Sequence, residues 1–245
     1  MNGYSLQVRR QARFSTGNDI VALQATQPEK TNRPRFYSRI LTVAEQQLYD
    51  RLDRSSLAFD HYTWLCWSIK ESAYKFNKRN SPDLVFAPLK ITISELLPPA
   101  SEGYYRCRVS FGQEMLFSCS LVRDGIVVTV VSEDEQFTDT HWGFQSIGSS
   151  AYACQSSSVR TFALRHLSTA LSRNDLQLQK DQNGCPIVLA GQQRLDIPLS
   201  LAHHDTYVAW SFMAARGIAS HKENQPQIGP LPSIAAGSCH LPGKD

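Results

Sequence analysis

One stretch of the chain, between residues 58 and 78, limits the possible fold more than any other. Its apolar residues recur at alternating steps of three and four, so they form one stripe along a single long helix. These residues are Phe59, Tyr62, Cys66, Ile69, Ala73 and Phe76. Asn80-Ser81-Pro82 ends the pattern, because the residue before a proline disfavours helical geometry. The sequence therefore predicts a long helix with one buried side.

The same helix carries charge on a different side. Glu71 and Lys75 lie one turn apart, Trp67 lies one turn earlier, and Lys70 precedes Glu71 directly. A carboxylate and a lysine in this arrangement could hold a divalent metal ion and a phosphate together. The two residues are also an ordinary i,i+4 ion pair, which stabilises an isolated helix by about 0.2–0.5 kcal/mol. Their spacing alone leaves both interpretations open.

Strands and one short helix are predicted around this helix. Residues 15–24 read as a short strand, and Thr42 with Glu45 forms a capping-box pattern that opens a helix through about Leu52. Residues 84–132 are rich in β-branched and aromatic side chains and predict an antiparallel meander. Its expected strands cover residues 84–93, 104–111, 115–122 and 126–131.

The rest of the chain reads as a loop, a helix and more strands. Residues 133–150 are loop-like, and the spacing of Val159, Phe162 and Ala170 predicts a helix over about residues 158–171. Asn183-Gly184 is a strong turn signal between two of the later strands. Those strands are expected at residues 176–180, 186–189, 196–202 and 206–212. Residues 217–245 lack periodicity and predict a disordered tail.

The composition is that of an ordinary folded protein. The 245 residues are 42% hydrophobic and 19% charged, so the chain can build a large core. A net charge of +3 does not favour nucleic acid as a partner, and no apolar run reaches the length of a membrane span. The six cysteines include no C-x-x-C pair, and we interpret them as reduced thiols. We therefore expect a cytoplasmic protein that binds neither nucleic acid nor membranes.

Two more segments carry candidate site residues. Asp19 lies in an apolar strand, where an acid is costly to bury unless it is paired or binds a metal ion. Ser200 and His203 lie at a strand-to-strand corner, where a His beside a Ser can donate to a phosphate or a ribose. Taken singly, such residues more often have a structural role.

The order of these segments resembles that of the 4′-phosphopantetheinyl transferases, with the arrangement of the holo-[acyl-carrier-protein] synthases. The resemblance covers about residues 15–80 and 175–213. It rests on Gly17-Asn18-Asp19-Ile20, on the segment from Arg39 to Glu45, on Lys70-Glu71-Ser72-Ala73-Tyr74-Lys75 after Trp67, on Asn183-Gly184-Cys185-Pro186, and on Ser200-Leu201-Ala202-His203. The Lys-Glu helix is the most specific of these motifs.

The resemblance implies an α+β fold, in which an antiparallel sheet packs on the long helix. It also implies one transferase-like domain over residues 1–216, with a large β-rich insertion at about residues 81–174. Two departures from the family pattern stand out. Val21 occupies the position of a second acid in the Sfp-like branch, and Ala202 replaces the usual hydroxyl residue beside His203.

The implied activity is transfer of the 4′-phosphopantetheine group of coenzyme A to a serine of an apo acyl or peptidyl carrier protein. The resemblance makes Asp19 and Glu71 the ligands of Mg²⁺, with Mn²⁺ as an alternative. It makes Glu71 and Lys75 the catalytic residues. Coenzyme A would contact Lys75, Ser200 and His203, with Lys70 as a weaker candidate. Fatty acid biosynthesis is one pathway that such carriers serve.

Two other functions remain open at the level of sequence. Ala202 and the missing second acid are compatible with a degenerate module that binds coenzyme A or a carrier protein without turnover. A binder of single-stranded nucleic acid would use Trp64, Trp67 and Tyr74 as stacking platforms. The small net charge and the position of these rings near the apolar stripe argue against the second function.

Overall fold

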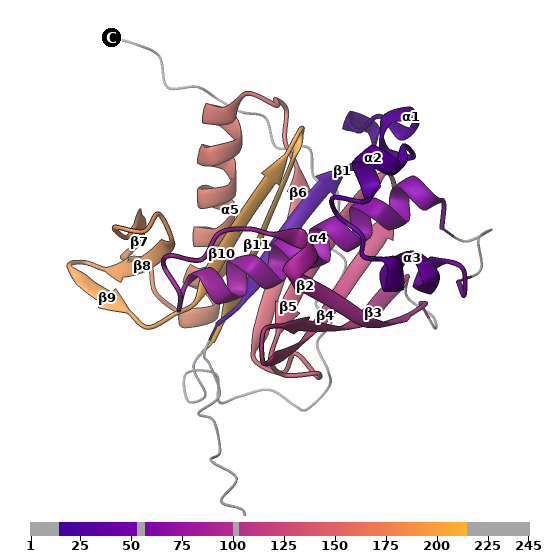
Figure 1. Ribbon diagram of the computed structural model, residues 1–245. Coiled ribbons are helices and arrows are strands. Elements are labelled where there is room, and N and C mark those ends of the chain that lie inside the picture. Colours follow the sequence, from indigo (N-terminus) through magenta and orange to yellow (C-terminus); the bar gives the residue numbers. More distant parts are fainter. Residues whose placement is uncertain (1–14, 53–56, 100–102, 215–245) are drawn as a thin grey trace, which may run out of the picture.

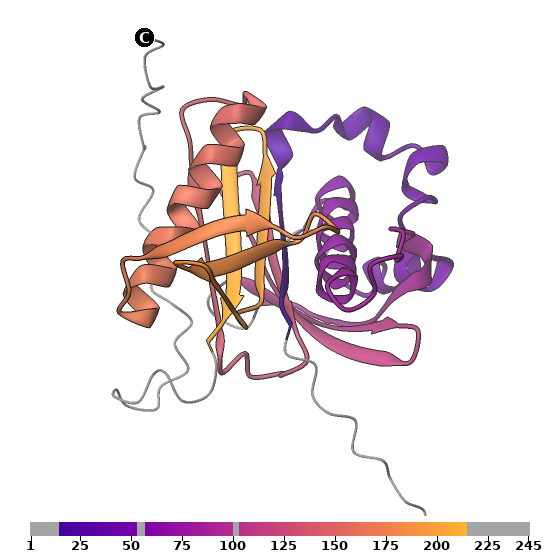
Figure 2. The same ribbon diagram turned by 90° about the vertical axis from the view of Figure 1, so that its left-hand side faces the viewer.

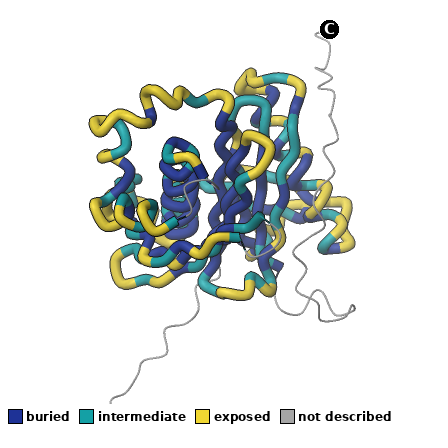
Figure 3. The backbone as a smooth tube through the Cα atoms, turned by 90° about the vertical axis from the view of Figure 1, so that its right-hand side faces the viewer, coloured by how far each residue is buried: buried dark blue, intermediate teal, exposed yellow. Residues whose placement is uncertain are grey.

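Two helices enclose two antiparallel sheets in the computed structural model of this protein. The structure describes residues 15–52, 57–99 and 103–214. Helix α4 (Phe59–Lys78) covers a five-stranded sheet, and helix α5 (Tyr152–Leu171) covers a three-stranded one. Figure 1 shows the elements, and Figure 2 shows α4 and α5 on opposite sides of the strands. In Figure 3 the buried residues concentrate on α4 and the strands beside it.

The first half of the chain is a strand, a helix and a meander. Its strands are β1 (Gly17–Ala22), β2 (Ile91–Leu97), β3 (Tyr104–Phe111), β4 (Glu114–Arg123) and β5 (Ile126–Ser132). The sheet order is β1-β5-β4-β3-β2, so the last strand of the meander returns to pair with the first strand of the chain. Short helices α1 (Pro28–Thr31), α2 (Pro34–Tyr37) and α3 (Val43–Tyr49) and the 3₁₀ turns η1 (Leu23–Ala25) and η2 (Pro88–Lys90) fill the connections.

The second half repeats this order of elements. Its strands are β6 (Thr140–Ser146), β7 (Leu176–Lys180), β8 (Pro186–Ala190), β9 (Gln193–Leu195), β10 (Leu199–His204) and β11 (Tyr207–Met213). Here too a helix, α5, follows the first strand, and the last strand, β11, pairs antiparallel with that first strand and with β10. Strands β7, β8 and β9 form a small sheet of their own. The molecule therefore consists of two halves with related topology.

The two halves meet through β1, β5, β10, β11 and β6. A small apolar cluster lies between them and includes Ile20 and Val128 from the first half and Ala202 and Ala209 from the second. Alanine side chains at this contact let the strands approach closely. The stripe on α4 faces the first sheet, with Tyr62, Cys66, Ile69, Ala73 and Phe76 fully buried in the largest core cluster.

Several predicted boundaries differ from the structure. The strand predicted at residues 84–93 begins at Ile91, because Pro88 opens the 3₁₀ turn before it. The segment 133–150 is not only loop: residues 140–146 form β6, which pairs along its whole length with β11. Helix α5 begins at Tyr152 rather than near Ser158, because buried Cys154 and Gln155 anchor the extra turn. Strand β9 was not predicted.

The segment 81–174 is part of the frame rather than an appendage. Strands β2–β5 complete the sheet that begins with β1, and β6 and α5 build the second half. The predicted insertion is therefore not a separate unit in this structure. The predicted tail at residues 217–245 lies outside the described residues.

Two expectations from composition concern thiols and membranes. Cys66, Cys107, Cys119 and Cys185 are free, whereas Cys154 is disulfide-bonded, so the prediction of reduced thiols is wrong for Cys154. Among the helices in the described part of the chain, none is long and apolar enough to cross a membrane.

Candidate active site

Gly17 brings β1 and α4 into direct contact. Alternation along the strand places Gly17, Asp19 and Val21 on the face toward α4. A Cβ atom on Gly17 would lie 2.0 Å from the backbone oxygen of Ser72 and 2.7 Å from the backbone nitrogen of Phe76. No residue with a side chain fits there without moving the helix. The glycine thus sets how closely Asp19, two residues later, approaches the charged side of α4.

Lys75 lies between two carboxylates at this crossing. Its Nζ donates to Asp19 Oδ1 and to the backbone oxygen of Asn18, both at 3.1 Å, and pairs with Glu71 Oε1 at 3.2 Å. The side chain of Asp19 is only 8% exposed, whereas those of Lys75 and Glu71 are 25% and 28% exposed. The cluster therefore has a buried acid, a bridging lysine and a partly open second acid.

Electrostatics make Asp19 the unusual member of this cluster. Burial raises the pKa of Asp19, Lys75 and the hydroxyl of Ser68 act to lower it and Glu71 acts to raise it, and the resulting pKa is about 6. Burial also opposes the charge on Lys75, but Asp19 and Glu71 outweigh it and hold the pKa of Lys75 above the ordinary lysine value. One carboxylate oxygen, Asp19 Oδ2, is buried and meets no donor in hydrogen-bond geometry, although the hydroxyl of Ser68 is near enough to the carboxylate to act on its pKa.

These residues fit a divalent cation. A buried carboxylate oxygen without a partner is costly, and a cation would remove that cost. Asp19 and Glu71 supply the oxygen ligands that Mg²⁺ prefers, and Mg²⁺ usually takes one or two carboxylates and keeps several waters. Within the described part of the chain, no group of three or more His, Cys, Asp or Glu side chains is placed to hold a metal ion. Among the described residues, Asp19 and Glu71 would thus be the two carboxylates that hold the ion.

His203 belongs to the same region, at the end of β10. Its side chain is exposed, and its ring meets that of Tyr152 edge-on at 5.6 Å between centroids. Burial of part of the ring lowers the pKa of His203, and the positive charges of Lys75 and Lys180 lower it further. The second half of the chain therefore brings a neutral imidazole toward the cluster on α4.

Residues 15–114 match the family model of the 4′-phosphopantetheinyl transferase superfamily. This segment belongs to that superfamily. The match includes Asp19, Glu71 and Lys75, and it extends over β2 and β3, which the sequence resemblance had left outside. No curated protein matches the chain.

Lys70 has a different place in the transferase domain from the predicted one. It is fully buried, and its Nζ donates to Glu45 Oε2 and to the backbone oxygen of Ile40, both at 2.7 Å. Glu45 in turn accepts from the backbone nitrogens of Thr42 and Ile93. Lys70 therefore ties α4 to the capping box of α3 and to β2, and the prediction that it contacts coenzyme A is wrong.

Ser200 also has a structural partner. It is 5% exposed, and its Oγ accepts a hydrogen bond from the backbone nitrogen of Asn18 at 3.1 Å. We do not retain Ser200 as a ligand of coenzyme A, because this burial leaves little of it accessible. His204, next to His203 in the sequence, was not predicted as a site residue. Its Nδ1 accepts from the backbone nitrogen of Ala22 at 2.9 Å. Alternation along β10 separates it from His203, and that signal was available in the sequence.

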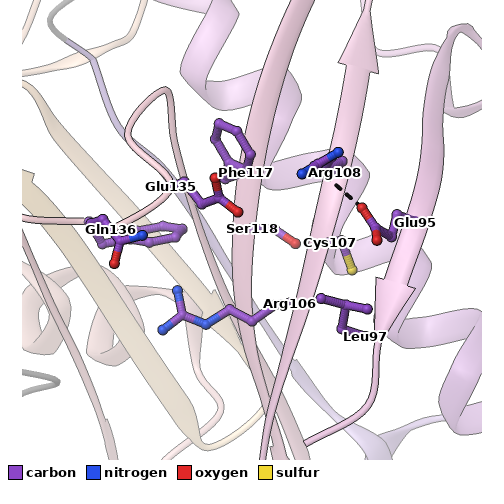
Figure 4. A pocket seen from close by; sticks show the side chains of 10 residues that line it. Glu95, Leu97, Arg106, Cys107, Arg108, Phe117, Ser118, Glu135 and Gln136 are labelled. Atoms are coloured by element: carbon purple, nitrogen blue, oxygen red, sulfur yellow. Dashed lines mark ion pairs between the residues drawn. The ribbon is translucent and has the colours of Figure 1, made fainter.

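A cavity of about 260 Å³ lies elsewhere in the protein. It covers the face of β2, β3 and β4 that points away from α4, and residues 135–137 line part of it (Figure 4). Arg108 pairs with Glu95 there at 3.3 Å, and Arg106 lies 5.3 Å from the centre of the Phe137 ring. Neither Asp19 nor Glu71 lines this cavity, so it is separate from the candidate active site.

Proposed function

We propose that this protein transfers the 4′-phosphopantetheine group of coenzyme A to a serine of an apo acyl or peptidyl carrier protein. The observation that carries the proposal is the cluster of Asp19, Lys75 and Glu71, which lies within the segment of the superfamily. The family match supports phosphopantetheinyl transfer in general. The holo-[acyl-carrier-protein] synthase activity, the carrier substrate and a cytoplasmic location are the finer parts of the proposal.

Asp19 and Glu71 are the proposed ligands of Mg²⁺, with Mn²⁺ as an alternative. Bound there, the ion would neutralise the pyrophosphate of coenzyme A, where negative charge develops as the nucleotide leaves. The unpartnered Oδ2 of Asp19 supports this assignment, because a buried anionic oxygen calls for a positive partner.

Glu71 is the proposed base. In the reaction the hydroxyl oxygen of the carrier serine forms a bond to the β-phosphorus of coenzyme A, and the bond from that phosphorus to the bridging oxygen breaks. The serine proton passes to Glu71, directly or through a water molecule, and 3′,5′-ADP leaves. The partial exposure of Glu71 lets it meet an incoming serine, which buried Asp19 cannot do.

Lys75 and His203 would hold the phosphates. Lys75 is a point charge already placed between the two carboxylates, and it can reach a phosphate on the solvent side of the cluster. His203 is exposed at the edge of the site and would contact the nucleotide end of coenzyme A. Arg39, which is exposed, would present positive charge to the acidic carrier.

A degenerate binding module is the second candidate, and the two replacements that favour it lie at buried positions. Val21, at the position of the missing acid, is 3% exposed and belongs to the apolar core beneath α4. Ala202, which replaces a hydroxyl residue, is 4% exposed in the cluster between the two halves. Both replacements therefore lie among buried apolar side chains.

The test is mass spectrometry of several apo carrier proteins after incubation with this protein, coenzyme A and Mg²⁺. Carriers of fatty acid, polyketide and peptide synthesis should be compared, and a gain of one phosphopantetheine that EDTA abolishes is expected for at least one. Asp19→Ala and Glu71→Ala should each abolish the gain while leaving the circular dichroism spectrum unchanged. Full activity in either variant would refute the metal assignment, and coenzyme A binding without any mass gain would favour the binding module.

A further inference from the structure

Strand β1 is held on its two edges in two different ways. On one edge it forms a regular antiparallel ladder with β5, in which Asp19 lies opposite Thr129. Its other edge faces β10, which forms its own ladder with β11 and none with β1. Backbone N–H groups on a buried edge need acceptors, because an unpaired buried donor is costly. Every residue of β1 is buried, so this requirement applies here.

Two side chains of β10 supply those acceptors. Ser200 Oγ accepts from the nitrogen of Asn18 at 3.1 Å, and His204 Nδ1 accepts from the nitrogen of Ala22 at 2.9 Å. Ser200 and His204 are four residues apart, so both point to the same face of β10, with Ala202 between them in the interface of the two halves. The two bonds thus reach across from the second half to the first.

The two bonds lie on either side of Asp19 along β1. Asn18 lies just before Asp19, and Ala22 lies three residues after it. On the remaining side, the backbone oxygen of Asn18 accepts from Lys75, which also binds Asp19 Oδ1. The strand that presents Asp19 to α4 is therefore fixed on both sides of the carboxylate by the side chains of β10.

We propose that Ser200 and His204 are positioning residues that hold Asp19 in place for a divalent cation. They act through the backbone of β1 and do not touch the cation or the substrate. The inference rests on the proposed function only in that Asp19 is taken as a metal ligand. It implies that the superfamily segment, residues 15–114, is not sufficient to form the site, since both acceptors come from the second half.

The protonation of His204 agrees with its role as an acceptor. Nδ1 can accept from Ala22 only when the imidazole is neutral, with its proton on Nε2. Burial lowers the pKa of His204, and the negative charges of Asp205 and Glu71 oppose this in part. The ring is therefore neutral at neutral pH and free to accept through Nδ1.

The test compares His204→Asn with His204→Leu in the full chain. The side-chain oxygen of Asn can take the position of Nδ1 and accept from Ala22, whereas Leu cannot accept at all. Ser200→Ala removes the other acceptor with little change of volume, and His61→Leu is the matched control, because the side chain of His61 on α4 is 42% exposed. Two readouts that need no activity are Mn²⁺ affinity by electron paramagnetic resonance and amide exchange of residues 17–22. The Mg²⁺ dependence of carrier modification is the third readout.

His204→Leu and Ser200→Ala should each weaken Mn²⁺ binding by about tenfold, as changes around metal ligands commonly do, and speed amide exchange in β1. In His204→Asn and His61→Leu the Mn²⁺ affinity should stay within about threefold of that of the unmodified protein. Loss of a group that supports a metal ligand commonly has a larger effect than this. In the kinetic readout the KM for Mg²⁺ should rise more than kcat falls.

Three results would overturn the inference. One is normal Mn²⁺ affinity in His204→Leu and Ser200→Ala despite fast exchange, which would make the contacts purely structural. Another is equal loss in His204→Asn and His204→Leu, which would make ring shape rather than the acceptor responsible. The third is an unmodified protein that binds no Mn²⁺. If the unmodified protein binds Mn²⁺ but modifies no carrier, the proposed function fails and the positioning role stands.

Discussion

Asp19 shows how a single residue can be explained only by its surroundings. The strand pattern indicated a costly buried acid, and the motif suggested a metal ligand. Neither could reveal that Lys75 would bind one carboxylate oxygen and leave the other without a partner, because that depends on how α4 crosses β1. The residue types of the cluster were thus predictable from sequence, whereas the state of each oxygen was not.

Asp19 should make the stability of the metal-free protein depend on pH. The pKa of about 6 in the folded protein lies above the ordinary value of 3.8, so its contribution to stability is fully present below about pH 4 and is lost as the pH rises through about 6. Mg²⁺ should restore stability above pH 6, where Asp19 is ionised, and have little effect below it. Thermal melting from pH 4 to 8, with Mg²⁺ or with EDTA, measures both effects.

The control for this prediction is Asp19→Asn, which cannot titrate at this position. Other carboxylates also change stability over this range, so the informative quantity is the difference between the two proteins. The difference in melting temperature should vary with pH mainly between about 4 and 6. A constant difference, or an equal effect of Mg²⁺ on both proteins, would contradict the assignment.

Lys70 illustrates a residue that the motif misplaced. It lies beside Glu71 in sequence, but one residue on a helix is a turn of about 100°, and this turn takes Lys70 into the core. Removing one partner of a buried ion pair leaves the other uncompensated, so Lys70→Met should lower the free energy of unfolding by about 3–5 kcal/mol. The fraction that remains folded should keep the KM for coenzyme A of the unmodified protein.

Denaturant unfolding and steady-state kinetics test the two parts of that prediction. The matched control is Lys90→Met, since Lys90 is exposed, and its unfolding midpoint should not move. A raised KM for coenzyme A in Lys70→Met with unchanged stability would restore the role that the sequence suggested.

At the scale of elements, the helices could be predicted from signals within their own sequence, whereas a strand that depends on pairing with a distant strand could not. The capping box of Thr42 and Glu45 has both of its hydrogen bonds, and the apolar stripe of α4 is buried as its spacing indicated. Strand β6, by contrast, contains His141, Gly143 and Gln145 and looks like a loop in isolation. It is a strand because β11 pairs with it and because Gly143 leaves room for the ring of Trp210.

The crossing of β1 and α4 should tolerate no side chain at Gly17. Gly17→Ala would place a methyl group 2.0 Å from a backbone atom of α4, so the helix must move away from the strand. Overpacking of this kind costs about 1–3 kcal/mol. The same movement would separate Asp19 from Lys75, so carrier modification should be lost even at temperatures where the variant is folded.

Gly112→Ala is the comparison for that variant. Gly112 has φ +63°, so alanine there is strained, but nothing lies within 4 Å of the added atom. This variant should lose about 1–2 kcal/mol, the cost of a side chain in the left-handed region, and keep its activity. If Gly17→Ala unfolds at the same denaturant concentration as the unmodified protein, the close crossing does not constrain the site.

At the scale of the whole molecule, the repeated topology raises the question of a second site. Each half has a first strand, a helix and a returning last strand, so an equivalent cluster could lie between β6 and α5. The sequence showed no repeat, because the halves share the order of elements rather than their side chains. The helices of the two halves differ in their charged residues. Helix α4 carries Glu71 and Lys75, whereas α5 contains neither an Asp nor a Glu.

One divalent cation per chain should therefore bind tightly. Without a carboxylate on α5, the second half has no counterpart of Glu71, and cation sites built of oxygen ligands need such groups. Titration with Mn²⁺, followed by calorimetry or electron paramagnetic resonance, should give a stoichiometry of one, and Asp19→Asn should abolish that event. Two equivalent sites, or one site that survives in Asp19→Asn, would mean that the cation binds away from the contact between β1 and α4.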